Sequence, residues 1–311
     1  MLALGRKLLV PVTRALLGSA AERGLCRAEL LAAAGISEDD LAVTDSWISI
    51  ERHVRLGAAI EARLPGENLG LQTGERIYHD PAGAFGYVLR RSGTHAVALA
   101  NFGAYLGLVN HALHAELQLA ATEGCFQVQM QPELAALGHP AEALLSAWVA
   151  ISRHLTARDW APSGVQFEHE AKGDVREHEA FFRCPVEFGQ GPTCLQIPAG
   201  ALGLEIEPTS HEIDAALARS LEDAREKLGI ADLQTELDAL ADRLRTPPRS
   251  VRAPGSPGAR TSGIVLDVAR GLFEHSRLCA YEVAFLVGFQ DLAVFQQAYS
   301  DRFGLRPLPR G

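Results

Sequence analysis

The sequence predicts an α+β domain of helices and a small antiparallel sheet, followed by an all-α helix-turn-helix domain. Three observations in the 311 residues support this fold class. Helical periodicity dominates the first third of the chain, short strand-like runs lie between residues 115 and 198, and helical periodicity returns from His211. We place the domain boundary near Pro208, so that residues 1–208 form one domain and residues 209–311 the other.

The composition is that of a folded protein. Hydrophobic residues make up 47% and charged residues 22%, which excludes a disordered chain. The five cysteines are scattered, odd in number and form no CxxC pair: Cys26, Cys125, Cys184, Cys194 and Cys279. We therefore expect no disulfide framework, no zinc site and a cytoplasmic location.

The N-terminal segment superficially imitates a signal peptide, with a basic start and an apolar stretch. Pro11, Thr13 and Arg14 interrupt that stretch before it reaches the usual length. We favour an amphipathic helix, because near-helical spacing relates Leu8, Leu9, Val12, Leu16 and Leu17. No run approaches the roughly 18 apolar residues of a membrane span, so we expect no membrane partner.

Helices fill the first part of the chain. Breaks at Gly35 and at Pro65-Gly66 separate them, and residues 51–64 fit one helix. Residues 94–113 predict a second, strongly apolar helix, for which Thr94 is the N-cap.

Strands follow in the second part. Residues 115–130 alternate around Glu123-Gly124 and predict a hairpin. A helix over 141–155 comes next, and then three short strands over 164–171, 185–189 and 193–198. We expect these strands to be antiparallel.

Residues 281–302 fit two short helices joined by a turn. Tyr281 to Val287 form the first, with Val283, Ala284 and Leu286 buried. Gly288 supplies a turn at which a positive φ is tolerated, and Asp291 caps a second helix that continues through Arg302.

The second of these helices has two different faces. Phe295, Tyr299 and Phe303 recur at every fourth position and predict its buried side. The opposite, exposed face then holds Ala293, Gln296, Gln297 and Ser300. This geometry is typical of a helix-turn-helix that offers a polar face to the major groove, although an ordinary helical hairpin fits the same spacing.

The run from Glu282 to Pro307 resembles the second helix-turn-helix of AraC-type transcription regulators. The matching residues are Glu282, Val283, Ala284, Gly288, Phe289, Asp291, Phe295, Ala298, Tyr299, Gly304 and Pro307. Upstream, five segments resemble the arabinose-binding-type effector domain of the same family: ELLAAAGIS, NLGLQTGERI, GAFGYVLRRSGT, GVQFEHEA and FFRCPVEFGQ. The resemblance implies an effector-sensing and dimerisation domain over residues 1–208 and a DNA-binding domain over residues 209–311.

The same resemblance subdivides the second domain into a linker helix (209–232), a first helix-turn-helix (233–262) and a second one (263–311). The first departs from the family, because Pro254 and Pro257 stand where its basic reading helix should continue. Each proline removes a backbone donor and costs about 3 kcal/mol within a helix. Ala253 and Gln297 also replace arginines that the family places at base-reading positions.

We expect DNA contacts from both helix-turn-helix units. Ala293, Gln296 and Gln297 would face bases in one groove, and Arg249 and Arg252 would contact phosphates or bases in the next. The candidates for further phosphate contacts are Arg302 and Arg306. Residues 240–311 hold ten Arg and six acidic residues, a formal charge of +4, whereas the remainder carries −13.

An effector pocket is expected along the helix predicted over 94–113. His111 and His114 lie three apart, so they either line a cavity or sit in the core with local hydrogen bonds. Together with Phe102 and Tyr105 they are our candidates for effector binding.

A run of acidic residues and histidines invites a metal-site interpretation: Glu168, His169, Glu170, Glu177, His178 and Glu179. On a strand, however, His169 and its flanking glutamates face opposite sides, so we favour a solvated strand edge and no metal.

Two functional hypotheses remain. The first is a homodimeric, effector-responsive regulator that binds double-stranded DNA, mainly through the second helix-turn-helix. The second is a ligand-binding or dimerising relative that no longer reads DNA and titrates intact regulators. The chain contains no GxSxG, HExxH, P-loop or Rossmann pattern, so we expect no enzyme, no catalytic residues and no cofactor.

Overall fold

The computed structural model describes residues 6–43, 46–77, 83–206, 263–289 and 291–307, together with positions 215, 216, 219, 220 and 223. The chain divides into two compact units. Unit 1 combines residues 1–80 and 109–204, and unit 2 combines residues 81–108 and 205–311. The α+β fold of the first part and the helical fold of the C-terminal part are confirmed. The predicted boundary near Pro208 differs from this division, because residues 81–108 cluster with the C-terminal residues.

Unit 1 opens with helices and a two-stranded sheet: β1 (Lys7–Leu9), α1 (Val10–Glu22), α2 (Arg27–Ala34), α3 (Glu38–Ala42), β2 (Trp47–Ser49) and α4 (Ile50–Glu61). The predicted amphipathic helix is confirmed from Val10, but Leu8 and Leu9 belong to β1, which pairs antiparallel with β2. Pro11 lies in the first turn of α1, where its missing N–H costs nothing. Gly35 ends α2 in the left-handed conformation, with φ 65°.

Two further helices of unit 1, α5 (Leu69–Ile77) and α9 (His139–Thr156), pack closely because glycines line their contact. A Cβ atom at Gly70 would lie 2.7 Å from the Cα of His139 and overlap its carbonyl oxygen. A Cβ atom at Gly74 would lie 2.8 Å from the backbone nitrogen of Ala147 and overlap the carbonyl oxygen of Ala143. Only hydrogen atoms fit between these two backbones.

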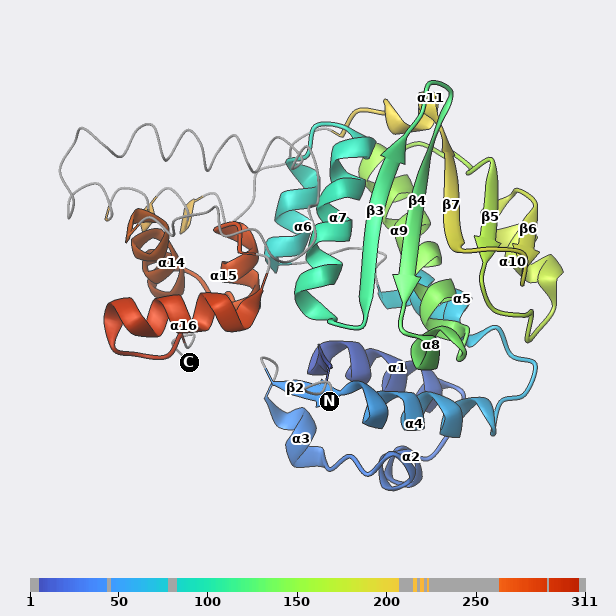
Figure 1. Ribbon diagram of the computed structural model, residues 1–311, viewed down its shortest axis with the longest axis horizontal. Helices are drawn as coiled ribbons and strands as arrows, with labels where there is room; N and C mark the ends of the chain where they lie inside the picture. The colour runs from blue at the N-terminus through green and yellow to red at the C-terminus, as the bar shows by residue number, and fades with distance from the viewer. Residues whose placement is uncertain are drawn as a thin grey trace. The chain divides into compact units, whose positions relative to one another are not determined.

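A five-stranded sheet forms the other half of unit 1, in the order β3-β4-β7-β5-β6 (Figure 1). Its strands are β3 (Leu113–Leu119), β4 (Glu123–Met130), β5 (Gly164–Phe167), β6 (Val186–Phe188) and β7 (Thr193–Pro198), with the short helices α8 (Pro132–Ala135) and α11 (Ala199–Leu202). The predicted hairpin is confirmed as β3 and β4, with Leu117 opposite Phe126. Phe126 also lies opposite Leu195 of β7, and both side chains are fully buried.

One strand pair contradicts the antiparallel expectation. β5 and β6 are parallel, and the chain between them forms the helix α10 (Val175–Phe182). Parallel neighbours need such a crossover, because a tight turn reverses the chain. Asp174 begins α10 by accepting a hydrogen bond from the Arg176 backbone nitrogen at 3.0 Å. The prediction of a continuous strand over residues 164–171 was therefore too long.

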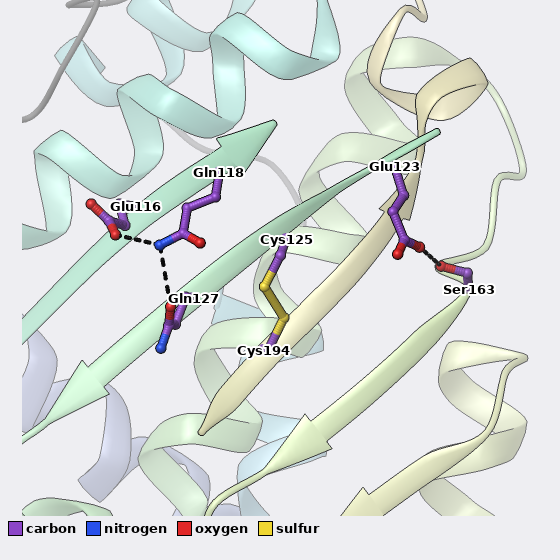
Figure 2. The surroundings of a disulfide bond; sticks show 7 residues. All are labelled: Glu116, Gln118, Glu123, Cys125, Gln127, Ser163 and Cys194. Atoms are coloured by element: carbon purple, nitrogen blue, oxygen red, sulfur yellow. Dashed lines mark hydrogen bonds between the residues drawn. A yellow bond between two sulfur atoms is a disulfide. The ribbon is translucent and has the colours of Figure 1, made fainter. Parts of the chain in front are cut away.

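A disulfide joins Cys125 of β4 to Cys194 of β7, with the Cα atoms 6.2 Å apart. Figure 2 shows the two side chains pointing toward one another across neighbouring strands. No sequence pattern indicated this pair, because the cysteines are 69 residues apart and become neighbours only through the β4–β7 register. The expectation of unpaired cysteines was wrong at these two positions, while Cys26, Cys184 and Cys279 are free thiols.

The regular elements of unit 2 are helices in its described residues, apart from an isolated antiparallel bridge between Thr94 and Glu205. Its elements are α6 (Gly83–Arg90), α7 (His95–Val109), α14 (Gly263–His275), α15 (Ala280–Leu286) and α16 (Leu292–Phe303). The Thr94 cap of α7 is confirmed, since its hydroxyl accepts a hydrogen bond from the Val97 backbone nitrogen at 3.4 Å. The predicted helix over 94–113 was too long, however, because α7 ends at Val109. The predicted first helix-turn-helix (233–262) and most of the linker helix (209–232) lie outside the described residues.

We expect Gly74→Ala to destabilise the protein by about 1–3 kcal/mol, because the new methyl group would overpack the α5–α9 contact. The matched control is Gly18→Ala in α1, where an added Cβ meets nothing within 4 Å. That substitution should be neutral or stabilise the helix by up to about 1 kcal/mol. Urea unfolding of both variants measures the difference, and equal stabilities would contradict the close-contact assignment.

Candidate nucleic-acid interface and polar cavity

The turn between α15 and α16 has the geometry expected of a helix-turn-helix. Gly288 has φ 88°, a conformation that side chains with a Cβ rarely adopt. Asp291 caps α16 by accepting a hydrogen bond from the Val294 backbone nitrogen at 3.0 Å. Glu282 caps α15 by accepting one from the Cys279 backbone nitrogen, also at 3.0 Å. The predicted short helix, glycine turn and aspartate cap are all confirmed.

The predicted aromatic stripe of α16 faces inward. Phe295 is fully buried, Tyr299 is 6% exposed and Phe303 is partly buried. From α14, the ring of Phe273 lies 6.4 Å from that of Phe295 and 5.6 Å, edge to face, from that of Tyr299. These aromatic contacts join α14 to α16, and α15 packs against both helices, so the three form one small three-helix unit.

The face of α16 opposite this stripe is open. Ala293 and Gln297 are exposed, and Gln296 and Ser300 are partly exposed. The side-chain amide of Gln297 donates a hydrogen bond to the Asp301 carboxylate at 2.7 Å. The candidate reading face therefore carries an acidic group next to its central amide.

The arginines expected to contact DNA phosphates differ in whether they already bind another group of the protein. Arg302 pairs with Asp267 of α14, and its guanidinium lies 5.5 Å from the centre of the Phe303 ring. It therefore supports the three-helix unit, and its contact with a DNA phosphate stays a prediction. Arg306 is exposed beyond the end of α16. Arg249 and Arg252 lie outside the described residues.

The four candidate effector residues do not share one helix. Phe102 and Tyr105 are on α7, but His111 follows it in a turn, where its ring lies 4.6 Å from Trp47. His114 is on β3, 3.8 Å from Glu116. The expectation that both histidines extend the apolar helix was wrong, because the chain reverses at residues 110–112 to enter the sheet.

Tyr105 packs against the helix-turn-helix instead of an open pocket. Its ring lies edge to face with Phe285 of α15 at 5.1 Å and 6.4 Å from the ring of Tyr281. Burial raises the pKa of the Tyr281 phenol well above its usual value. Phe102 is fully buried in the core. The role of these residues in effector binding stays a prediction.

The acidic, histidine-containing run after β5 is solvated at its four glutamates, which are exposed, but its two histidines are not. His178 is on α10 and His169 precedes it, and both imidazoles are buried. Both face Glu142 of α9, which is 3% exposed: its Oε1 lies 3.4 Å from His178 Nε2 and 3.8 Å from His169 Nε2. Gly138 permits this arrangement, since a Cβ there would lie 2.9 Å from the His169 ring.

Next to Glu142, unit 1 contains a cavity of about 150 Å³. Its polar lining comes from α4, α9 and the loops beside them: Glu61, Glu67, His139, Glu142 and Lys172. The remaining lining is mostly apolar and includes Ile60, Leu64, Leu69 and Leu137. None of the four candidate effector residues lines it.

An ion-pair network crosses this cavity. The Lys172 ammonium donates to Glu61 Oε2 at 2.7 Å, and His139 Nδ1 lies 3.4 Å from Glu61 Oε1. The pKa of the Glu61 carboxyl is lowered, because the hydrogen bonds from His139 and Lys172 outweigh the opposing effect of burial. No sequence motif indicated these residues, which converge only through the packing of α4, α9 and the loop after His169.

Within the described residues, no helix is long and apolar enough to cross a bilayer. The same part of the chain brings together no group of three or more His, Cys, Asp or Glu side chains suited to a metal ion.

Comparison with known proteins identifies a family for the chain. Residues 24–206 match the family model described as the arabinose-binding domain of AraC transcription regulator, N-terminal. The ornithine utilization regulator of Pseudomonas aeruginosa is 25% identical, over 96% of this chain and 95% of that protein. The crystal structure of transcriptional regulator CdpR from Pseudomonas aeruginosa aligns with a TM-score of 0.43 and 22% identity, over 90% of this chain and 94% of that one.

The buried His53 predicts a specific pH dependence of stability. Burial, assisted by the nearby His139, lowers its pKa from 6.5 to about 3. Between these two values the unfolded chain binds one more proton at this site than the folded protein does. The stability that His53 contributes is therefore complete above pH 6.5 and is lost as the pH falls toward 3, by at most about 1.4 kcal/mol per pH unit.

We expect His53→Gln to make the free energy of unfolding depend less steeply on pH between 6 and 4. The control is His154→Gln at an exposed position of α9, which should keep a pH dependence near that of the wild type. Urea unfolding at several pH values measures both slopes. An unchanged slope in His53→Gln would show that this imidazole is not held neutral by the fold.

Proposed function

Because the chain belongs to the AraC family of transcription regulators with an arabinose-binding-type N-terminal domain, we propose that it reads specific DNA through α16 in response to a small-molecule effector. The exposed face of Ala293 and Gln297, backed by the buried Phe295 and Tyr299, is the observation that carries the proposal. A helix held in this way offers its polar side to the major groove without disturbing its own core.

The chemistry of this face limits what it can read. A glutamine amide pairs with adenine through one donor and one acceptor, whereas alanine contacts only a thymine methyl group. One N–H of the Gln297 amide is bonded to Asp301, which leaves its second N–H and its carbonyl oxygen for a base. We therefore propose modest sequence discrimination by α16 alone, with Arg306 as a phosphate contact and Arg249 and Arg252 as further contacts.

Packing within unit 2 supports a route from effector to DNA. Residues 83–109, which include α6 and α7, lie inside the segment matched by the effector-domain family. α6 packs on α15, and Tyr105 of α7 contacts Phe285 and Tyr281 of α15. An effector that shifts α7 would shift α15 with it, provided that the effector binds one arrangement more tightly than the other.

The alternative is a family member that no longer reads DNA and titrates intact regulators. Asp301 favours it, because a carboxylate on the reading face repels DNA phosphates. We propose that the DNA-reading version acts as a homodimer, that the alternative forms mixed dimers with an intact relative, and that either one is cytoplasmic. The ornithine utilization regulator supports an effector drawn from small-molecule metabolism.

Fluorescence anisotropy with the chain's own promoter region separates the two versions. At ~150 mM salt, a DNA-reading regulator should bind this duplex at least ~10³-fold more tightly than random DNA. A DNA-incompetent relative should show only weak binding that falls steeply with salt.

The Gln297→Ala variant tests the reading face itself. Loss of its base contact should weaken specific binding by about tenfold or more and leave binding to random DNA unchanged. Gln129→Ala, at an exposed position of β4, is the matched control and should bind both duplexes like the wild type. If Gln297→Ala also binds the promoter like the wild type, α16 does not read bases through this residue.

A further inference from the structure

We infer that the cavity beside Glu142 binds a short aliphatic ammonium ion. The inference starts from a buried charge. Glu142 is 3% exposed and lines the cavity, yet among the described residues its carboxylate faces only two imidazoles, at 3.4 and 3.8 Å. A carboxylate removed from water is costly unless a cation or several hydrogen bonds compensate it.

The other charges of the cavity are already paired. Glu61 binds Lys172 at 2.7 Å, and Glu67 binds Arg23 at 3.0 Å. Glu142 is therefore the carboxylate of the cavity lining to which a cationic ligand would supply the counter-ion. An anionic ligand would instead bring a second negative charge beside a buried carboxylate, which costs several kcal/mol.

A second observation points to a ligand in the same place. His139 lines the cavity and is 7% exposed, and its Nε2 has no hydrogen-bond partner among the described residues. Buried polar atoms nearly always have a partner, so an orphan at the wall of a cavity favours an occupant with polar groups. An ammonium has three donors, which suits the Glu142 carboxylate and an imidazole lone pair together.

The size and the remaining lining limit the rest of the ligand. A cavity of about 150 Å³ is as large as an engineered one that accepts benzene, so it holds roughly six non-hydrogen atoms. Leu64, Leu69 and Leu137 provide apolar walls for a chain of a few methylene groups. The fitting class is therefore a small alkylamine or diamine, and not a sugar or an aromatic acid.

This inference depends on the proposed function only in naming the ligand an effector. The α5–α9 contact preorganises the cavity, since Gly70 brings Leu69 of α5 against His139 of α9. A ligand here bridges α4, α9 and the loop that carries Lys172.

The test compares three probes of equal length on the full chain at pH 8: n-butylammonium, n-butanol and n-butyrate. Ligand-observed NMR titration measures their dissociation constants, and for so few atoms we expect a value on the order of 1 mM for the amine. Its affinity should exceed that of the neutral and anionic probes by at least tenfold. Equal binding of the three probes, or no binding of the amine, would overturn the inference.

Two variants move the affinity in opposite directions. Glu142→Gln should weaken amine binding at least tenfold, whereas Lys172→Met, at the exposed rim, should strengthen it by releasing the Glu61 carboxylate. Glu187→Gln at an exposed position of β6 is the control and should bind like the wild type. If Glu142→Gln fails to fold, Lys172→Met still decides the test. Unchanged or weaker amine binding in Lys172→Met contradicts the inference.

A separate measurement distinguishes this inference from the proposed function. DNA anisotropy is repeated with saturating n-butylammonium. Amine binding without a change in DNA affinity would count against an effector role and leave the cavity assignment standing. Specific DNA binding by a chain that takes up no amine would overturn the cavity assignment and leave the regulator standing.

Discussion

The orientation of the candidate DNA-reading helix depends on the packing of Phe295 and Tyr299 of α16 against Phe273 of α14. These rings are buried in contact with one another, and they orient α16 so that Ala293 and Gln297 face outward. A slip of the helix by one residue would turn the glutamine toward the core and expose an aromatic ring. The Gly288 turn and the Asp291 cap fix where α16 begins, so they make such a slip costly.

In unit 1 the corresponding constraint is the glycine contact between α5 and α9. Gly70 and Gly74 let the two backbones meet without intervening side chains, and this closeness places His139 and Glu142 at the cavity. The arrangement leaves buried polar atoms of His139, His169 and His178 without hydrogen-bond partners in the described part of the chain. Such atoms usually have partners, and one of these residues, His139, lines the cavity.

Some elements of the fold were easier to predict from the sequence than others. The C-terminal helices were predictable, because a stripe of Phe295, Tyr299 and Phe303 with a glycine turn and an aspartate cap is local information. The end of α7 was not predictable in this way. Its apolar pattern continues past Val109 into β3, and only the pairing of β3 with β4 ends the helix.

The cavity shows where local reasoning fails. His169 and Glu142 are far apart in the sequence, and the pattern around His169 suggested an exposed strand edge. The helix α10 and the parallel pair of β5 and β6 instead bury the two histidines of this segment against Glu142 of α9, while its glutamates stay exposed. The Cys125–Cys194 disulfide has the same origin, since strand register alone brings the two cysteines together. Tertiary contacts of this kind leave no periodic signal in one sequence.

Photo-crosslinking from α16 tests the central claim, that this helix lies in the major groove, most directly. A benzoylphenylalanine at Ala293, with the same residue at Gln129 as the reference position, is irradiated in the presence of the promoter duplex or random DNA. The account predicts crosslinks from position 293 that concentrate at a few bases of the promoter, and none from position 129. Promoter binding with no crosslink from position 293, or equal crosslinking from both positions, would contradict it.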